Sequence, residues 1–142
     1  MKGDKAAANA AFTTARNEAA KLVADQPDYA EALCVLGMAD AALGSKADAI
    51  RKGRRAVELL PVKKKAIEGY LLIEYLALIY AWTGEKDLAF EQLFVAARTP
   101  GFLSYGELRL HPRWDLLRGD PRFHKIVASL APNKALLDQR ST

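Results

Sequence analysis

Cysteine and histidine are scarce in this chain of 142 residues, which contains one cysteine and two histidines. A single cysteine cannot form a disulfide framework, and so few thiol and imidazole groups exclude the common zinc clusters. Valine and isoleucine are also few, and no stretch alternates apolar and polar residues as a half-buried strand does. The composition therefore excludes a stapled small fold and argues against a β-sheet.

No run of residues is long and apolar enough to suggest a membrane span. The most apolar run, residues 66–82, includes Glu68 and Glu74 and is shorter than the ~20 residues that cross a bilayer. The first residues lack the apolar core of a signal peptide. We therefore expect no membrane partner and, for this chain by itself, a cytoplasmic location.

Alanine and leucine, both strong helix formers, are the commonest residues, and the length suits one domain. Proline and glycine divide the sequence into helical segments, because proline disfavours helical geometry in the residue before it and glycine ends helices. The sequence predicts an all-α domain over residues 1–131 and a flexible tail over residues 132–142. Helices are expected over residues 4–25, 29–43, 46–60, 64–82, 86–98, 102–110, 112–118 and 120–130.

The chain contains an internal repeat with an offset of 40 residues. Each unit is a helix, a glycine turn and a second helix. Small residues at set places allow two backbones to approach closely, and a glycine in the turn permits a left-handed conformation. The matching pairs are Gly37 with Ala77, Gly44 with Gly84, Ala49 with Ala89, and Ala56 with Ala96.

These residues resemble the tetratricopeptide repeat, whose period is about 34 residues. The first unit, residues 30–63, matches its spacing at Leu33, Leu36, Gly37, Gly44, Ala49, Ala56 and Pro61. The second unit, residues 64–100, matches at Ile73, Leu76, Ala77, Tyr80, Gly84, Ala89 and Ala96. The first unit departs from the pattern with Asp40 at the usual tyrosine place and Gly53 at the usual aromatic place. The resemblance implies a right-handed superhelix of helical hairpins, in which residues 4–27 form a half-repeat.

Residues 108–123 are similar to a closing segment that follows the last repeat in bacterial tetratricopeptide proteins, although His111 stands where aspartate is usual. The resemblance implies short capping helices over residues 102–131. It also implies that the chain is the C-terminal part of a larger bacterial signalling or regulatory protein.

In the family, the first helices of the repeats line a concave groove that binds peptides. The corresponding positions here are Glu31, Cys34, Met38, Ala41, Leu71, Glu74, Leu78 and Ala81. They are mostly apolar or acidic and lack the lysine and asparagine of a carboxylate clamp. An apolar peptide or helix, with a basic residue meeting Glu74, fits this groove better. The alternative is that the N-terminal helix or a neighbouring domain fills it.

No catalytic or cofactor-binding motif is present, so we expect neither an enzyme nor a cofactor or metal site. Cys34 is interpreted as a small buried hydrophobe, since no histidine lies nearby in the sequence. His111 and His124 are interpreted as surface or locally hydrogen-bonded residues. The tripeptide at residues 118–120 is interpreted as a helix stop followed by an Asp-Pro helix start.

Basic side chains cluster in residues 46–65, which carry eight lysines and arginines and two acidic residues. Such a cluster attracts phosphate, but no aromatic residue is interleaved for base stacking. The sequence thus favours a non-catalytic protein-interaction module that binds a peptide, a helix or a neighbouring domain in the groove. Two alternatives stay open: a spacer or homodimerisation module, and a module that binds nucleic acid or an acidic partner through residues 46–65.

Overall fold

The computed structural model describes residues 2–60, 66–98 and 105–130, and these residues form helices and turns without a strand. The expected all-α class is confirmed. Pro61, residues 99–104 and the expected tail over residues 132–142 lie outside the described residues. The helices are α1 (Lys2–Asp25), α2 (Ala30–Ala42), α3 (Lys46–Leu59), α4 (Ala66–Trp82), α5 (Lys86–Ala97), α6 (Tyr105–Leu110) and α7 (Pro121–Leu130), with a 3₁₀ turn η1 (Pro112–Trp114).

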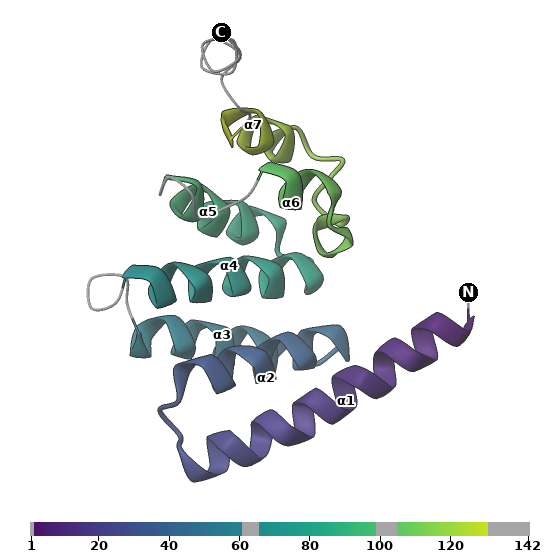
Figure 1. The fold of residues 1–142 in the computed structure, drawn as a ribbon, viewed down its shortest axis with the longest axis vertical. Coiled ribbons are helices and arrows are strands. Elements are labelled where there is room, and N and C mark those ends of the chain that lie inside the picture. Colours follow the sequence, from purple (N-terminus) through teal and green to yellow (C-terminus); the bar gives the residue numbers. More distant parts are fainter. Residues whose placement is uncertain (1, 61–65, 99–104, 131–142) are drawn as a thin grey trace, which may run out of the picture.

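The helices pack mainly against their neighbours in sequence, in layers from α1 to α7 (Figure 1). Helix α2 packs against α1, α3 and α4, and α4 packs against α3 and α5. Helix α7 and the 3₁₀ turn η1 lie against α5 and α4, respectively. Helix α1 diverges from α2, so its N-terminal end projects from the body. This arrangement leaves one face of α1 and α2 without a covering layer.

The two hairpins, α2–α3 and α4–α5, turn with the same backbone geometry. Gly44 has a φ of 92° and Gly84 a φ of 86°, in the left-handed region that glycine adopts readily. Ser45 N–H donates to Asp40 O at 2.8 Å, and Glu85 N–H donates to Tyr80 O at the same distance. These bonds satisfy carbonyls that a helix end would otherwise leave unpaired. The turns therefore match at the 40-residue offset seen in the sequence.

The small residues of the repeat lie where helices meet. Gly37 and Gly53 are buried, and each of the five alanines is fully buried: Ala49, Ala56, Ala77, Ala89 and Ala96. At Gly53, a Cβ atom would lie 2.8 Å from Ile79 Cδ1 and 2.9 Å from Leu76 Cδ1. The aliphatic side chains of α4 thus occupy the space that an aromatic residue at position 53 would fill. Side chains of α4 therefore take the place of the aromatic residue that the repeat pattern has at position 53.

Asp40, the second departure, is a fully buried carboxylate that joins three helices. Its Oδ1 lies 2.9 Å from Arg16 Nε of α1, and its Oδ2 forms an ion pair with Lys52 of α3. In the second hairpin, Tyr80 occupies the equivalent place and its hydroxyl accepts a hydrogen bond from Arg54 Nε at 2.7 Å. A buried carboxylate needs such cations, because its desolvation is otherwise costly. Asp40 therefore attaches α1 to the first hairpin.

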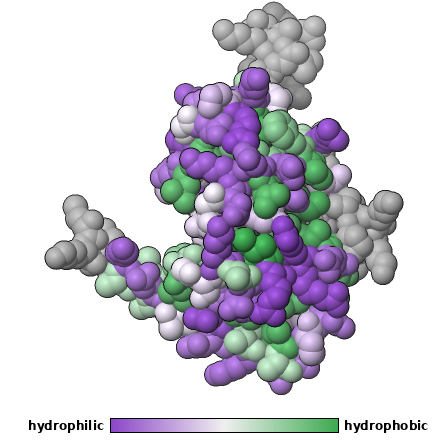
Figure 2. All heavy atoms as spheres, turned by 180° about the vertical axis from the view of Figure 1, so that it is seen from behind, coloured by the Kyte–Doolittle hydropathy of each residue, from purple (hydrophilic) through white to green (hydrophobic). Residues whose placement is uncertain are grey.

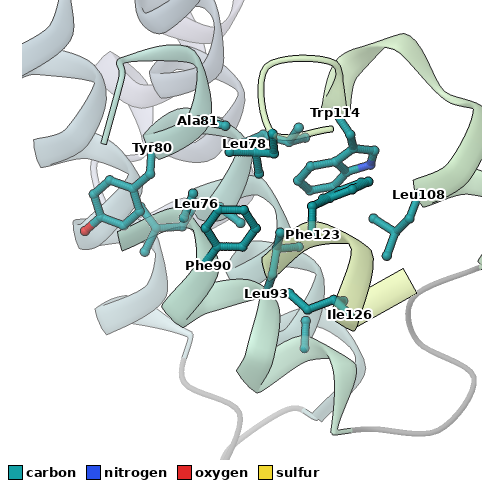
Figure 3. Close-up of a cluster of buried hydrophobic side chains, with 14 of the residues drawn as sticks. Leu76, Leu78, Tyr80, Ala81, Phe90, Leu93, Leu108, Trp114, Phe123 and Ile126 are labelled. Atoms are coloured by element: carbon teal, nitrogen blue, oxygen red, sulfur yellow. The ribbon is translucent and has the colours of Figure 1, made fainter. Parts of the chain in front are cut away.

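The C-terminal part packs around Trp114, which is fully buried with Leu117, Leu108 and Phe123. Figure 3 shows Trp114 beside Phe123, with Leu108 on one side and Leu78 of α4 on the other. A helix over residues 112–118 was expected, but only Pro112–Trp114 is helical, as a 3₁₀ turn, and residues 115–119 form turns. The tighter winding places Trp114 and Leu117, three residues apart, in the same core.

Arg118 joins the turns that follow η1 to the end of α6. Its guanidinium donates to the carbonyl oxygens of Leu108, Arg109 and His111, so these groups are satisfied by a side chain. Asp120 then begins α7, since its Oδ1 accepts the backbone N–H of Arg122 at 2.9 Å. The Asp-Pro helix start expected at residues 120–121 is confirmed.

The turn geometry predicts that Gly44→Ala destabilises the protein by about 1 kcal/mol. The strain of the left-handed conformation costs ~1–2 kcal/mol for alanine, and the lower entropy of the unfolded chain offsets part of it. Nothing lies within 4 Å of the added methyl group, so no clash contributes. Urea denaturation measures the change in unfolding free energy.

Gly119→Ala is the matched control, because its methyl group also meets nothing within 4 Å and its φ is not positive. We expect Gly119→Ala to be neutral. Equal effects of the two substitutions would show that the left-handed turn does not matter for stability.

Candidate functional site

An open apolar cleft runs along the seam between α1 and α2. One hollow of about 230 Å³ lies towards the connecting turn, and a second of about 250 Å³ lies towards α4. They are contiguous, since both are lined by Ala15 of α1 and Val35 of α2. The first is also lined by Glu18, Ala19, Leu22, Tyr29, Glu31 and Ala32. The second is also lined by Phe12, Met38, Ala39, Tyr75 and Arg113.

Helix α1 packs along α2 but buries little of its own side-chain surface. Only Ala19 of its described side chains is buried. The Phe12 ring meets the Trp82 ring edge-on, with centroids 6.0 Å apart, and Arg16 reaches Asp40. Trp82 is itself fixed by a 3.1 Å hydrogen bond from its Nε1 to Arg113 O. These contacts hold α1 at an angle and leave the seam open.

Large apolar side chains remain exposed around this seam. Leu22 is 49% exposed, Tyr29 40% and Val35 43%. Exposed apolar residues are ordinary when scattered, but three that line one hollow indicate an interaction surface. Elsewhere the surface mixes smaller hydrophobic patches with hydrophilic side chains, as the face in Figure 2 shows. The seam is therefore the strongest candidate site on the described part of the chain.

The structure brings only two of the expected groove residues to this cleft. Glu31 and Met38 line it, whereas Cys34 and Leu78 are fully buried. Leu71 is 36% exposed and Glu74 only 6%. The flanking positions Ala41 and Ala81 are buried as well. The expectation that Cys34 and Leu78 are open to a ligand is not met, because other elements of the chain cover them.

Two packing contacts explain the difference. Cys34 shares a core cluster with Leu72 of α4, against which Tyr75 also packs. Leu78 shares a core cluster with Trp114 and Leu117 of the C-terminal segment. The expected groove positions Cys34 and Leu78 are thus covered by α4 and by the segment that follows α6. The sequence contains no signal for this, because the contact depends on the angle at which these elements cross.

Sequence reasoning missed the residues that line the cleft most directly. Phe12, Val35, Tyr75 and Arg113 come from α1, α2, α4 and η1. Val35 follows Cys34 by one residue and is 43% exposed, whereas Cys34 is fully buried. In the sequence, Val35 could have indicated the cleft, because it is an apolar residue at a position that the repeat pattern does not assign to helix packing.

Of the residues that line the α4 end of the cleft, Arg113 is the one with a charged side chain. Arg113 pairs with Glu107 of α6, and both groups act electrostatically on Glu74 and on the Tyr75 hydroxyl. Burial raises the pKa of Glu74 to about 7, with a further contribution from the negative charge of Glu107. The Arg113 guanidinium opposes this rise. Glu74 is therefore about half protonated near neutral pH.

This pKa predicts how Glu74→Gln changes stability with pH. A folded-state pKa of about 7, above the ordinary 4.5, means that the folded protein binds a proton that the unfolded chain releases between these values. Unfolding free energy therefore falls as pH rises through this window. We expect Glu74→Gln to be more stable than the parent at pH 8, on the order of 2–3 kcal/mol, and to lose this advantage near pH 4.

Urea denaturation at several pH values measures the effect. Glu91→Gln, at an exposed position of α5, is the control and should change stability much less between the two pH values. A stability difference for Glu74→Gln that does not vary with pH would contradict the assignment.

The thiol of Cys34 is expected to be unreactive in the folded protein because it is buried. Burial raises the pKa of its thiol to about 12, with a smaller contribution from Glu31, so the thiol stays protonated at neutral pH. The thiolate is the reactive form of cysteine. Iodoacetamide at pH 8 should therefore leave the native protein unmodified and alkylate it in urea, as measured by mass spectrometry.

A Val35→Cys/Cys34→Ala variant is the matched control, because position 35 is 43% exposed. It should react in the native state. Fast native alkylation of the parent at Cys34 would contradict the fold around α2.

The basic residues of α3 are engaged by other side chains of the protein. Arg54 donates to the Tyr80 hydroxyl, and Lys52 pairs with Asp40. The remaining pairs are Lys46 with Glu85 at 2.7 Å, Arg51 with Asp48 at 2.8 Å, and Arg55 with Asp28 at 3.6 Å and Glu58 at 3.5 Å. Lys63, Lys64 and Lys65 lie outside the described residues. Within the described part, this face offers little unneutralised charge for phosphate.

His111 has a local structural role, since its Nδ1 accepts the backbone N–H of Arg113 at 3.2 Å at the start of η1. Among the described residues, no three histidine, cysteine or acidic side chains are grouped to hold a metal ion. In the same residues, no helix is long and apolar enough to cross a membrane. No family model, curated protein or solved structure matches the chain.

Proposed function

We propose that this chain is a non-catalytic protein-interaction module that binds a peptide or helix in the α1–α2 cleft. The observation that carries the proposal is the contiguous apolar cleft, with Leu22, Tyr29 and Val35 exposed along it. Burial of exposed apolar area is the main favourable term in most protein association. An interaction module needs no reacting group, and the only cysteine of the chain is a buried, protonated thiol.

The repeat supports a more specific form of this proposal. Two hairpins with the same glycine turn at a 40-residue offset fit a tetratricopeptide-like right-handed superhelix, with α1 as a half-repeat and the segment from α6 to α7 as a cap. Such units stack because one hairpin cannot bury its apolar face alone. In this proposal the chain is the C-terminal part of a larger bacterial signalling or regulatory protein. The peptide would come from another protein or from a neighbouring domain of the same chain.

A selection from a displayed library of random peptides tests the proposal. Leu22→Ser/Val35→Ser removes apolar side chains from the cleft, and both positions are exposed enough to leave the core intact. Leu110→Ser/Leu116→Ser is the control, because these residues are 76% and 56% exposed and do not line the cleft. We expect selected peptides to bind the cleft variant at least about tenfold more weakly and the control as tightly as the parent.

Binding that is insensitive to the cleft variant, or a selection that enriches nothing, would contradict a peptide-binding cleft. The competing proposal is a spacer or homodimerisation module. Light scattering over a concentration series tests for self-association. Self-association of the parent that the cleft variant abolishes would favour the homodimerisation module.

A further inference from the structure

Two carboxylates flank the apolar cleft, one on each wall. Glu18 projects from α1 and Glu31 from α2, and both line the hollow that contains Leu22 and Tyr29. Neither forms an ion pair with a described residue. Arg16, two residues before Glu18, is directed to Asp40 instead. This part of the cleft is therefore apolar at its floor and negative at its rims.

At the α4 end of the same cleft, the one positively charged lining residue is neutralised by a carboxylate. This residue is Arg113, which is paired with Glu107. Glu74 is only 6% exposed and forms no hydrogen bond or ion pair with the described residues. Its electrostatic partners there are Glu107 and Arg113, whose charges oppose each other. The α4 end therefore adds no unpaired positive charge that would repel a basic ligand.

The walls of the cleft also restrict the backbone of what can bind. Both α1 and α2 satisfy their own backbone hydrogen bonds internally, so they offer no free edge to an extended strand. A segment that packs against apolar walls must form its backbone hydrogen bonds within itself, and a helix does so. Phe12 and Leu22, at the two ends of the lining on α1, are ten residues apart, or about 15 Å along a helix.

We propose that the cleft binds an amphipathic helical segment of a protein partner, about ten residues long, whose apolar face is flanked by lysine or arginine side chains. This inference rests on the proposed function and adds the chemistry of the ligand. The apolar face packs on Val35 and Leu22, and basic side chains along its edges meet Glu18 and Glu31. Apolar burial supplies affinity, and the charges supply orientation and specificity.

Three synthetic peptides of equal length test the inference. All three have capped termini. The first and second carry the same leucine stripe at helical spacing, flanked by lysine in the first and by glutamate in the second. The third has the composition of the first in scrambled order. We expect fluorescence anisotropy to show at least about tenfold tighter binding of the first peptide than of either other peptide at low salt, with the difference shrinking as salt rises.

Glu18→Gln/Glu31→Gln tests whether the rim carboxylates cause this preference. It should weaken binding of the lysine peptide about five- to tenfold and should not weaken binding of the glutamate peptide. The matched control is Glu58→Gln/Glu91→Gln, which removes the same charge from exposed positions of α3 and α5. An equal loss with both variants would show only long-range attraction and would overturn the inference.

The outcomes separate this inference from the proposed function. Equal or tighter binding of the glutamate peptide, lost in Leu22→Ser/Val35→Ser, would overturn the basic ligand and leave the cleft as a binding site. Binding of the scrambled peptide as tight as the first would overturn the amphipathic helix. Failure of all three peptides to bind, together with a display selection that enriches nothing, would contradict both proposals.

Discussion

The close contact of α4 with the α2–α3 hairpin is the constraint on which the rest of the structure depends. Leu76 and Ile79 fill the space above Gly53, so α3 and α4 approach until a Cβ atom at position 53 would clash. This contact sets the angle of α4 and buries Cys34 behind Leu72. Helix α4 in turn provides the surface on which Trp114 and the C-terminal segment pack. Each layer thus fixes the position of the next.

Helix α1 is attached in a different way, and the cleft follows from it. Its buried contact with the body is made by alanine, and its larger contacts are the Phe12–Trp82 ring pair and the Arg16–Asp40 ion pair. Removing either partner of a buried ion pair is costly, whereas an alanine seam contributes little apolar area. Asp40 therefore specifies where α1 attaches, and the alanines determine that the seam stays shallow and open. The residue that departs most from the repeat pattern is the one that creates the candidate site.

Much of the fold, and little of the site, could be predicted from the sequence. Gly44, Gly84 and Asp120 mark helix ends through local backbone chemistry, so the helices α2 to α5 and α7 were expected within about two residues. The 3₁₀ turn at Pro112–Trp114 was not expected, because the segment is held by tertiary contacts, such as the hydrogen bond from Arg118 to Leu108 O, that the local sequence does not show. The cleft was displaced from the expected groove for the same kind of reason. Its lining is decided by how helices cross, which local patterns do not encode.

The charges around the cleft also make sense only in three dimensions. Along the sequence, the basic residues of α3 form the most conspicuous cluster, yet in the fold they meet Asp40, Tyr80 and Glu85. The carboxylates Glu18 and Glu31 stand out less in the sequence, yet neither forms an ion pair with a described residue, and both line an apolar hollow. Electrostatic attraction of a ligand depends on charge left unneutralised after folding, not on the number of charges in a segment. By that measure the acidic rim of the cleft, and not the basic helix, is the surface of this protein suited to a charged partner.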